Sequence, residues 1–265
     1  SVFPQWFGAI GNGIDADSAA IQSAVDFCAY SAIGYYGEVT GLTIKIPAGV
    51  YYIDSTITIP ENSGVNIVGE GHTKSILWAK TDISIIALSG NNYRGKIDGL
   101  RFANNQGKLV GCAIRIESSG NQINVANCWI NNLKYGIYCS PSSDSNFQNN
   151  TFEYVQTPIY IGGDGSGYFD ISHNTFYNVG PVSLGAGVFD PTFYIEGVTC
   201  LMLHHNRITN DTATSVQSSL ISVINSSNIA IESNIFNGTT FRAPSIKIDS
   251  STNIIIRDNI LPKNY

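Results

Sequence analysis

Short runs of alternating apolar and polar residues recur along most of the chain. In the second half they read "AIRIE" from residue 113, "GIYCS" from 136, "PIYIG" from 158, "TFYIE" from 192, "LISVI" from 220 and "SIKID" from 245. Alternation with a period of two is typical of a β-strand that buries one of its faces. Each run therefore predicts one short strand, and polar corners such as "ESSGN" and "INSSN" predict the turns between strands.

A second alternating run leads each time to an asparagine, as in "YFDISHNTF", "CLMLHHNRI" and "SNIAIESNIF". Successive asparagines are separated by 23, 24, 32, 28 and 25 residues, a period that is typical of a solenoid. Two or three short strands per repeat, stacked in parallel, describe a β-helix. The asparagines are Asn127, Asn150, Asn174, Asn206, Asn234 and Asn259.

Stacked repeats place equivalent residues above one another. We expect the asparagines to form an internal ladder of amides that satisfies backbone groups at a corner of the coil. The apolar residues two positions later are expected to form a column in the core. They are Trp129, Phe152, Phe176, Ile208, Phe236 and Leu261.

The segment "DADSAAIQSAVDFC" near the start has a helical pattern instead. Asp15, Asp17 and Ser18 offer oxygens for an N-cap, and a helix that begins near Asp17 would cover the first coil of the solenoid. Residues 1–40 are thus expected to form a capping segment. Residues 41–265 are expected to form one continuous β-helix, truncated at its C-terminal end because the repeat is still running there. The buried stripe of the helix is predicted to contain Ile21, Ala24, Val25 and Cys28.

Together with "IKIPAGVYYI" and "VNIVGEG", the N-terminal stretch "FGAIGNGIDADSAAIQSAV" resembles the N-terminal signature of the pectate-lyase-like superfamily. The resemblance implies an all-β fold, a right-handed single-stranded parallel β-helix (solenoid) with an N-terminal capping α-helix. That superfamily includes bacteriophage tailspikes and tail depolymerases, polysaccharide lyases, glycoside hydrolases and epimerases. Of the polygalacturonase motifs, Asn-Thr-Asp, Asp-Asp and His-Gly are absent from this chain, and Arg-x-Lys occurs only as Arg94-Gly95-Lys96.

Composition narrows the class of partner. The 265 residues carry a net charge of −6 with 14 Lys and Arg, so the chain lacks the basic surface that nucleic acid or an anionic membrane requires. No apolar run approaches the roughly 20 residues of a membrane span. The five cysteines are odd in number and lack CxxC spacing, which favours buried free thiols over a disulfide framework or a zinc site. No metal and no cofactor is expected.

Two long insertions mark the candidate active site. "NVGPVSLGAGVFDPT" and "NDTATSVQSS" lengthen two consecutive repeats, and long loops on a rigid scaffold commonly build binding walls. A glycosidase needs two carboxylates about 5 to 9.5 Å apart, so we expect the loops to gather such a pair. A solvated or turn-capping acid is the alternative for each carboxylate. The candidate catalytic residues are Glu153, Asp190, Glu196 and Asp211.

Tyrosines occupy outward positions of three successive repeats. Tyr138, Tyr160 and Tyr194 fall in one column beside Glu196, and their rings would offer flat apolar faces and hydroxyls to a saccharide. We therefore predict that they bind substrate. The alternative is an aromatic ladder that stabilises the sheet or forms a subunit contact.

A histidine and a glutamate align on the other strand of the repeat. His204 beside Glu232 would suit an acid–base pair in a lyase or a hydrolase, so both are candidates for substrate binding. A polar ladder on a solvated face is the alternative.

These patterns and the resemblance lead to one expected function. We expect a phage tailspike-like domain that binds and hydrolyses a bacterial surface polysaccharide, either capsule or O-antigen. It is expected to act as a homotrimer, with no nucleic acid or membrane partner. Its expected location is the virion tail or the extracellular space, after folding in a bacterial cytoplasm. The alternatives are a non-enzymatic carbohydrate-binding adhesin or structural tail domain, and a polysaccharide lyase that acts on a uronic acid.

Overall fold

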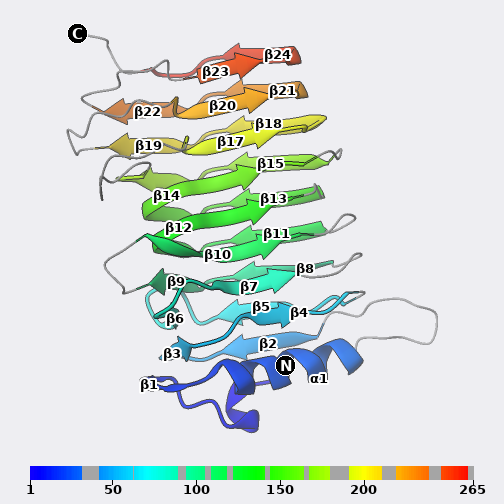
Figure 1. Cartoon of the computed structure of the whole chain (residues 1–265), viewed down its shortest axis with the longest axis vertical. Coiled ribbons are helices and arrows are strands. Elements are labelled where there is room, and N and C mark those ends of the chain that lie inside the picture. Colours follow the sequence, from blue (N-terminus) through cyan, green and yellow to red (C-terminus); the bar gives the residue numbers. More distant parts are fainter. Residues whose placement is uncertain are drawn as a thin grey trace.

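The chain winds into a right-handed parallel β-solenoid whose coils stack along one axis, with the helix α1 (Ser18–Ser31) at the N-terminal end (Figure 1). This confirms the all-β fold and the capping helix that the sequence predicts. The computed structural model describes residues 1–31, 42–61, 63–88, 94–104, 109–117, 122–140, 144–163, 167–179, 191–210, 219–238 and 246–261.

Two parallel sheets form the wall of the solenoid, with nine strands in sheet A and fifteen in sheet B among the described residues. Sheet A contributes one strand to each coil. Its strands are β2 (Thr43–Ile46), β5 (Asn66–Gly69), β8 (Arg94–Asp98), β11 (Gln122–Ala126), β13 (Asp144–Gln148), β15 (Tyr168–Ser172), β18 (Cys200–His204), β21 (Ser227–Glu232) and β24 (Thr252–Arg257).

Sheet B has two faces, which we call B1 and B2. Strands β12 (Trp129–Cys139) and β14 (Thr151–Ile161) pass from B1 to B2 through a bend where Asn132 and Tyr154 have φ of 58° and 52°. The other strands of B1 are β1 (Asn12–Ala16), β3 (Gly49–Ile53), β6 (Ser75–Ala79), β9 (Arg101–Asn104), β16 (Thr175–Tyr177), β19 (Arg207–Asn210) and β22 (Ile235–Gly238). Those of B2 are β4 (Ile57–Ile59), β7 (Ser84–Leu88), β10 (Val110–Ile116), β17 (Phe193–Glu196), β20 (Ile221–Ile224) and β23 (Ile246–Asp249).

One column of large apolar side chains runs through the core behind face B1. Phe152 and Phe176 stack with ring centroids 4.8 Å apart, and the whole column is buried. The predicted column is wrong at Trp129, which points outward, because Ile130 is the residue in register with Phe152. Leu261, at the last described coil, is 51% exposed. The observed members are Tyr51, Leu77, Phe102, Ile130, Phe152, Phe176, Ile208 and Phe236.

The predicted amide ladder is present from Asn150 to Asn259. Each of the first four amides donates to the oxygen of the next asparagine at 3.0–3.1 Å, and each also donates to a strand carbonyl one coil below. The prediction of Asn127 as a rung is wrong, because Cys128 takes that place and its N–H donates to Asn150 Oδ1 at 3.0 Å. Asn127 instead supplies the left-handed residue before the rung, with φ of 55°, a conformation that asparagine tolerates well.

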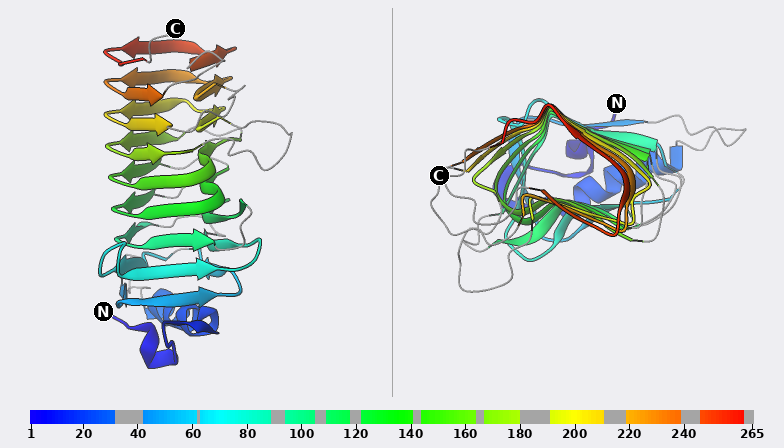
Figure 2. Two further views of the ribbon diagram at one scale, coloured as in Figure 1. Left: turned by 90° about the vertical axis from the view of Figure 1, so that its left-hand side faces the viewer. Right: turned by 90° about the horizontal axis from the view of Figure 1, so that it is seen from above.

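Helix α1 closes the N-terminal end of the solenoid. In the view along the solenoid axis it lies across the space that the coils surround (Figure 2). Its predicted stripe is buried, as expected for a cap over the core. The side-chain oxygens predicted to cap the helix accept hydrogen bonds from other segments instead. Asp17 Oδ1 accepts from the N–H of Ile10 at 2.6 Å, and Ser18 Oγ accepts from the N–H of Asp54 at 2.9 Å. These oxygens fasten the helix to neighbouring segments. In the described part of the chain no helix has the length and hydrophobicity to cross a membrane.

All five cysteines are free thiols, and four of them are buried, as the sequence predicts. Burial raises the pKa of Cys112 and of Cys128 to about 12, which leaves almost no thiolate near neutral pH. We therefore expect a thiol reagent such as dithionitrobenzoate at pH 8 to label the partly exposed Cys200 first. The other thiols should react only after unfolding in urea. Rapid reaction of two or more thiols in the folded protein would contradict this prediction.

Candidate functional site

Face B2 carries the predicted tyrosine column. Strand register places Tyr138, Tyr160 and Tyr194 side by side, with ring centroids 4.6 and 4.7 Å apart and ring planes within 5° of parallel. Because each ring lies against the next, both faces of Tyr160 are covered and the column presents ring edges and hydroxyls outward. The predicted alignment is confirmed. The flat faces that we expected to meet a sugar are instead used between the rings.

Glu196 lies directly after this column, at the end of β17. Its Oε2 accepts a hydrogen bond from the Tyr194 hydroxyl at 2.8 Å, and the side chain is partly exposed. Strand register continues the outward column of Glu196 through Ile224 to Asp249. Neighbouring strands lie about 4.8 Å apart, so two coils separate the strands of Glu196 and Asp249 by about 10 Å. That spacing is close to the upper limit, about 9.5 Å, for the two carboxyl groups of inverting glycosidases.

Glu153 lies on the other face of sheet B. It is the third residue of β14 and pairs with Asn131 and Tyr177 on B1, whereas β17, which carries Glu196, pairs with the last three residues of β14. The bend at Tyr154 separates the two positions, so the structure does not bring Glu153 and Glu196 together.

Two further predicted carboxylates, Asp190 and Asp211, lie outside the described residues. Their contribution to the site stays a prediction. The sequence places them in the insertions before β17 and β20, the strands of face B2 that carry Glu196 and Ile224.

Sheet A places His204 and Glu232 on adjacent strands, as predicted. His204 Nε2 lies 3.1 Å from Asp170 Oδ1, while Glu232 forms an ion pair with Arg257 through two contacts of 2.9 Å. The hydrogen bond and the negative charge of Glu232 raise the pKa of Arg257. Each side chain thus has its own partner, an arrangement typical of a polar ladder. Among the described residues, no group of three or more His, Cys, Asp or Glu side chains is placed to hold a metal ion.

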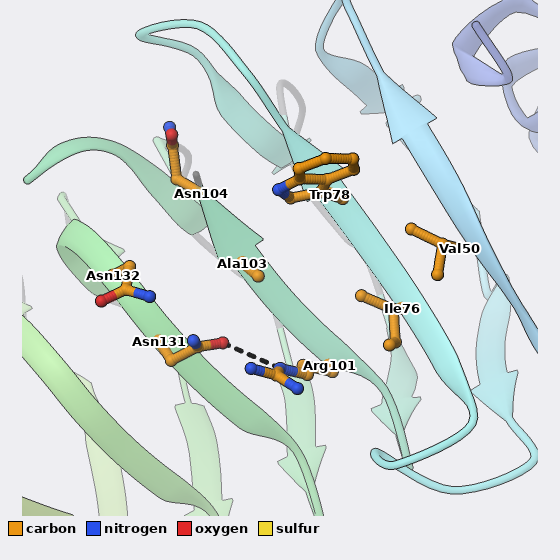
Figure 3. Close-up of a pocket in the computed structure, with 8 residues that line it drawn as sticks. All are labelled: Val50, Ile76, Trp78, Arg101, Ala103, Asn104, Asn131 and Asn132. Carbon is orange, nitrogen blue, oxygen red and sulfur yellow. Dashed lines mark hydrogen bonds between the residues drawn. The ribbon is translucent and has the colours of Figure 1, made fainter. Parts of the chain in front are cut away.

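A hollow that the sequence did not indicate opens on face B1, around Trp78, Arg101 and Asn131 (Figure 3). The sequence feature that could have revealed the hollow is the small residue Ala103. Strand register places it between Trp78 and Asn131 in an outward column. A missing side chain in a column can be recognised only when the register is known, because the spacing between repeats varies along the sequence.

The solved structures that share this fold include two phage tailspikes and a bacterial enzyme. The tailspike protein of Acinetobacter baumannii phage AM24 has a TM-score of 0.61 and 14% identity over 97% of this chain and 44% of its own. The enzymatically active domain of bacteriophage CBA120 tailspike protein 2 has a TM-score of 0.59 and 16% identity over 96% and 42%. DFA-IIIase from Arthrobacter chlorophenolicus A6 has a TM-score of 0.58 and 11% identity over 97% and 84%. At these identities the likeness concerns the fold alone.

Sequence comparison gives two curated relatives and two family models. The mannuronan C5-epimerases AlgE2 and AlgE5 of Azotobacter vinelandii are each 32% identical over 123 residues, which cover 35% of this chain and only 11% of either epimerase. The family model "Rhamnogalacturonase A/epimerase, pectate lyase-like" matches residues 5–113. The model "Right handed beta helix region" matches residues 112–265, more than half of the chain. The chain therefore belongs to the right-handed β-helix family.

Proposed function

We propose that this chain binds a bacterial surface polysaccharide along face B2 and hydrolyses it there with a pair of carboxylates. The observation that carries the proposal is the outward column of Glu196, Ile224 and Asp249 beside the tyrosine hydroxyls. The strands of the two acids lie about 10 Å apart, with Ile224 on the strand between them, and this spacing is close to that of the carboxyl pair in inverting glycosidases. The names of the two phage tailspikes of the same fold support the virion tail as the setting and a bacterial surface as the target, and we propose in addition that the chain acts as a homotrimer.

The two acids take different roles in this proposal. Glu196 is held by the Tyr194 hydroxyl, and a fixed carboxylate suits the base that orients and deprotonates the attacking water. Asp249 is exposed and accepts a hydrogen bond from Ser250 Oγ at 3.1 Å, so its carboxyl can reach a leaving-group oxygen at the surface. Water attack from the side opposite to the protonated bond inverts the anomeric carbon. Asp190 and Asp211 remain candidate catalytic residues, as the sequence predicts.

A second candidate function is chemistry at C5 of a uronic acid, either elimination or epimerisation. The supporting observation is the 32% identity to mannuronan C5-epimerases over 123 residues. Both reactions begin when a base removes the C5 proton. For this alternative we propose the Tyr194 phenolate on face B2 as the base, formed when the hydroxyl passes its proton to Glu196, to which it is hydrogen-bonded.

The test is to incubate the protein with a panel of purified capsular and O-antigen polysaccharides and follow two signals. Under the proposal, one polysaccharide releases reducing ends without new ultraviolet absorbance, and proton NMR shows an inverted anomer as the first product. Reducing ends with absorbance from unsaturated uronic products would establish elimination instead. Exchange of C5 hydrogen with deuterated water, without cleavage, would establish epimerisation. Binding without any of these signals would leave a carbohydrate-binding adhesin and overturn the hydrolase proposal.

A further inference from the structure

The hollow on face B1 is lined by residues of four consecutive strands, β3, β6, β9 and β12, and has a volume of about 340 Å³ (Figure 3). Ligand pockets commonly enclose about 300–1,000 Å³, so this hollow has room for a sugar unit. It lies on the far side of the bend at Asn132 from the carboxylates of face B2. The residues around it are Val50, Ile76, Trp78, Arg101, Ala103, Asn104, Asn131 and Asn132.

The hollow exists because one position in an outward column is small. Register stacks Trp78, Ala103 and Asn131 on β6, β9 and β12. With about 4.8 Å between strands, the backbones of β6 and β12 are about 10 Å apart at Trp78 and Asn131, and the residue between them in this column contributes only a methyl group. A pyranose ring in van der Waals contact with an indole fills such a gap, since aromatic rings offer a flat apolar surface.

The polar lining is positively charged. Arg101 Nε donates to Asn131 Oδ1 at 3.0 Å, and its guanidinium lies 4.2 Å from the centre of the Trp129 ring, so the side chain is held in one orientation. Among the described residues Arg101 forms no ion pair. Lys80 Nζ lies 4.7 Å from the Trp78 ring and adds a second cation beside the hollow. An oriented guanidinium is the group that binds a carboxylate best in proteins.

We infer that this hollow binds one acidic sugar unit of a polysaccharide, with the sugar ring on Trp78 and its carboxylate on Arg101. The side-chain amides of Asn131 and Asn132 form hydrogen bonds with the sugar hydroxyls. The inference rests on the proposed function in one respect, since it takes a polysaccharide as the ligand. It adds a second site, on another face of the solenoid, and the chemical class of sugar that this site selects.

The experiment uses the three tryptophans as reporters. Protein labelled with 5-fluorotryptophan gives one ¹⁹F signal each for Trp6, Trp78 and Trp129, assigned with single Trp→Phe variants. It is titrated with tetragalacturonate, with tetramannuronate, and with both tetramers after reduction of their carboxyls to alcohols. We expect saturable shifts of Trp78 and Trp129 with at least one acidic tetramer. Trp6, which is 67% exposed and does not line the hollow, should not shift.

Three variants sharpen the result. Arg101→Gln should weaken binding of the acidic tetramer about tenfold or more and leave the reduced tetramer within about twofold, because a charged hydrogen bond is lost only with the acid. Arg207→Gln is the matched control, since Arg207 is exposed in the same outward column several coils away and should have no effect. Ala103→Leu fills the gap and should abolish the shift of Trp78 with both kinds of tetramer.

The inference is overturned if Trp78 does not respond to either acidic tetramer, or if Arg101→Gln and Arg207→Gln weaken binding equally. Its failure is distinct from failure of the proposed function. Cleavage of a polysaccharide without a response at Trp78 would remove this site alone. A response at Trp78 in a protein that cleaves nothing would keep this site and remove the hydrolase.

Discussion

Replacing Asn174 by alanine is expected to lower the free energy of unfolding by about 3 kcal/mol or more. Its side chain accepts hydrogen bonds from the backbone N–H and the amide of Asn150, and donates to Phe147 O at 2.7 Å and to Asn206 Oδ1 at 3.0 Å. The alanine leaves the buried N–H of Asn150 without its acceptor, and a buried polar group without a partner costs about 1–3 kcal/mol by itself. The melting temperature should fall by roughly 6–12 °C.

Asn237→Ala is the matched control, because Asn237 lies on the outward side of β22 and is exposed. A surface change of this kind should stay within about 0.5 kcal/mol of the parent. The double variant with Asn206→Ala should lose less than the sum of the two single losses, since the two amides share hydrogen bonds. Equal stability of Asn174→Ala and Asn237→Ala in urea unfolding would show that the ladder does not stabilise the solenoid.

The coil architecture was predictable because strand alternation and the repeat period are local properties of the sequence. The exact residue at a corner was harder to predict. Each corner has two positions, a left-handed residue and then a rung, and asparagine suits the first through its tolerance of positive φ and the second through its amide. Asn127 takes the first role and Asn150 the second. The rung of this coil is Cys128 and not Asn127. The residue two positions after the rung points into the core, so that residue is Ile130 and not Trp129.

The candidate site depended on information that a sequence does not carry. The tyrosine column followed from equivalent positions in three repeats, yet the direction of the rings follows from packing between coils. Glu153 and Glu196 are both on sheet B, but the bend at Tyr154 sends them to different faces. The hollow on B1 arises from the absence of a large side chain at Ala103. Such an absence has no motif and needs the register of three strands.

Glu196→Gln is expected to lower the rate of polysaccharide cleavage by about 10²- to 10⁴-fold, the usual contribution of a general acid or base. Glutamine keeps the size of the side chain and an oxygen that accepts the Tyr194 hydrogen bond, so the melting temperature should not change. Asp249→Asn should cause a loss of the same order, because each carboxylate is needed in the same displacement. The rate is measured as reducing ends released from the polysaccharide that the panel identifies.

Variants of three other carboxylates test whether the loss of rate is specific to Glu196 and Asp249. Glu117→Gln is the closest control, since Glu117 lies in the same sheet after β10 but is paired with Arg115 at 2.6 Å, and its rate should stay within about twofold. Glu153→Gln on face B1 should also keep the rate, because its carboxylate is separated from the pair by the bend in β14. If Glu196→Gln and Asp249→Asn cleave at the parental rate while Asp211→Asn does not, the catalytic pair lies in the loop before β20 and face B2 serves only to hold the substrate.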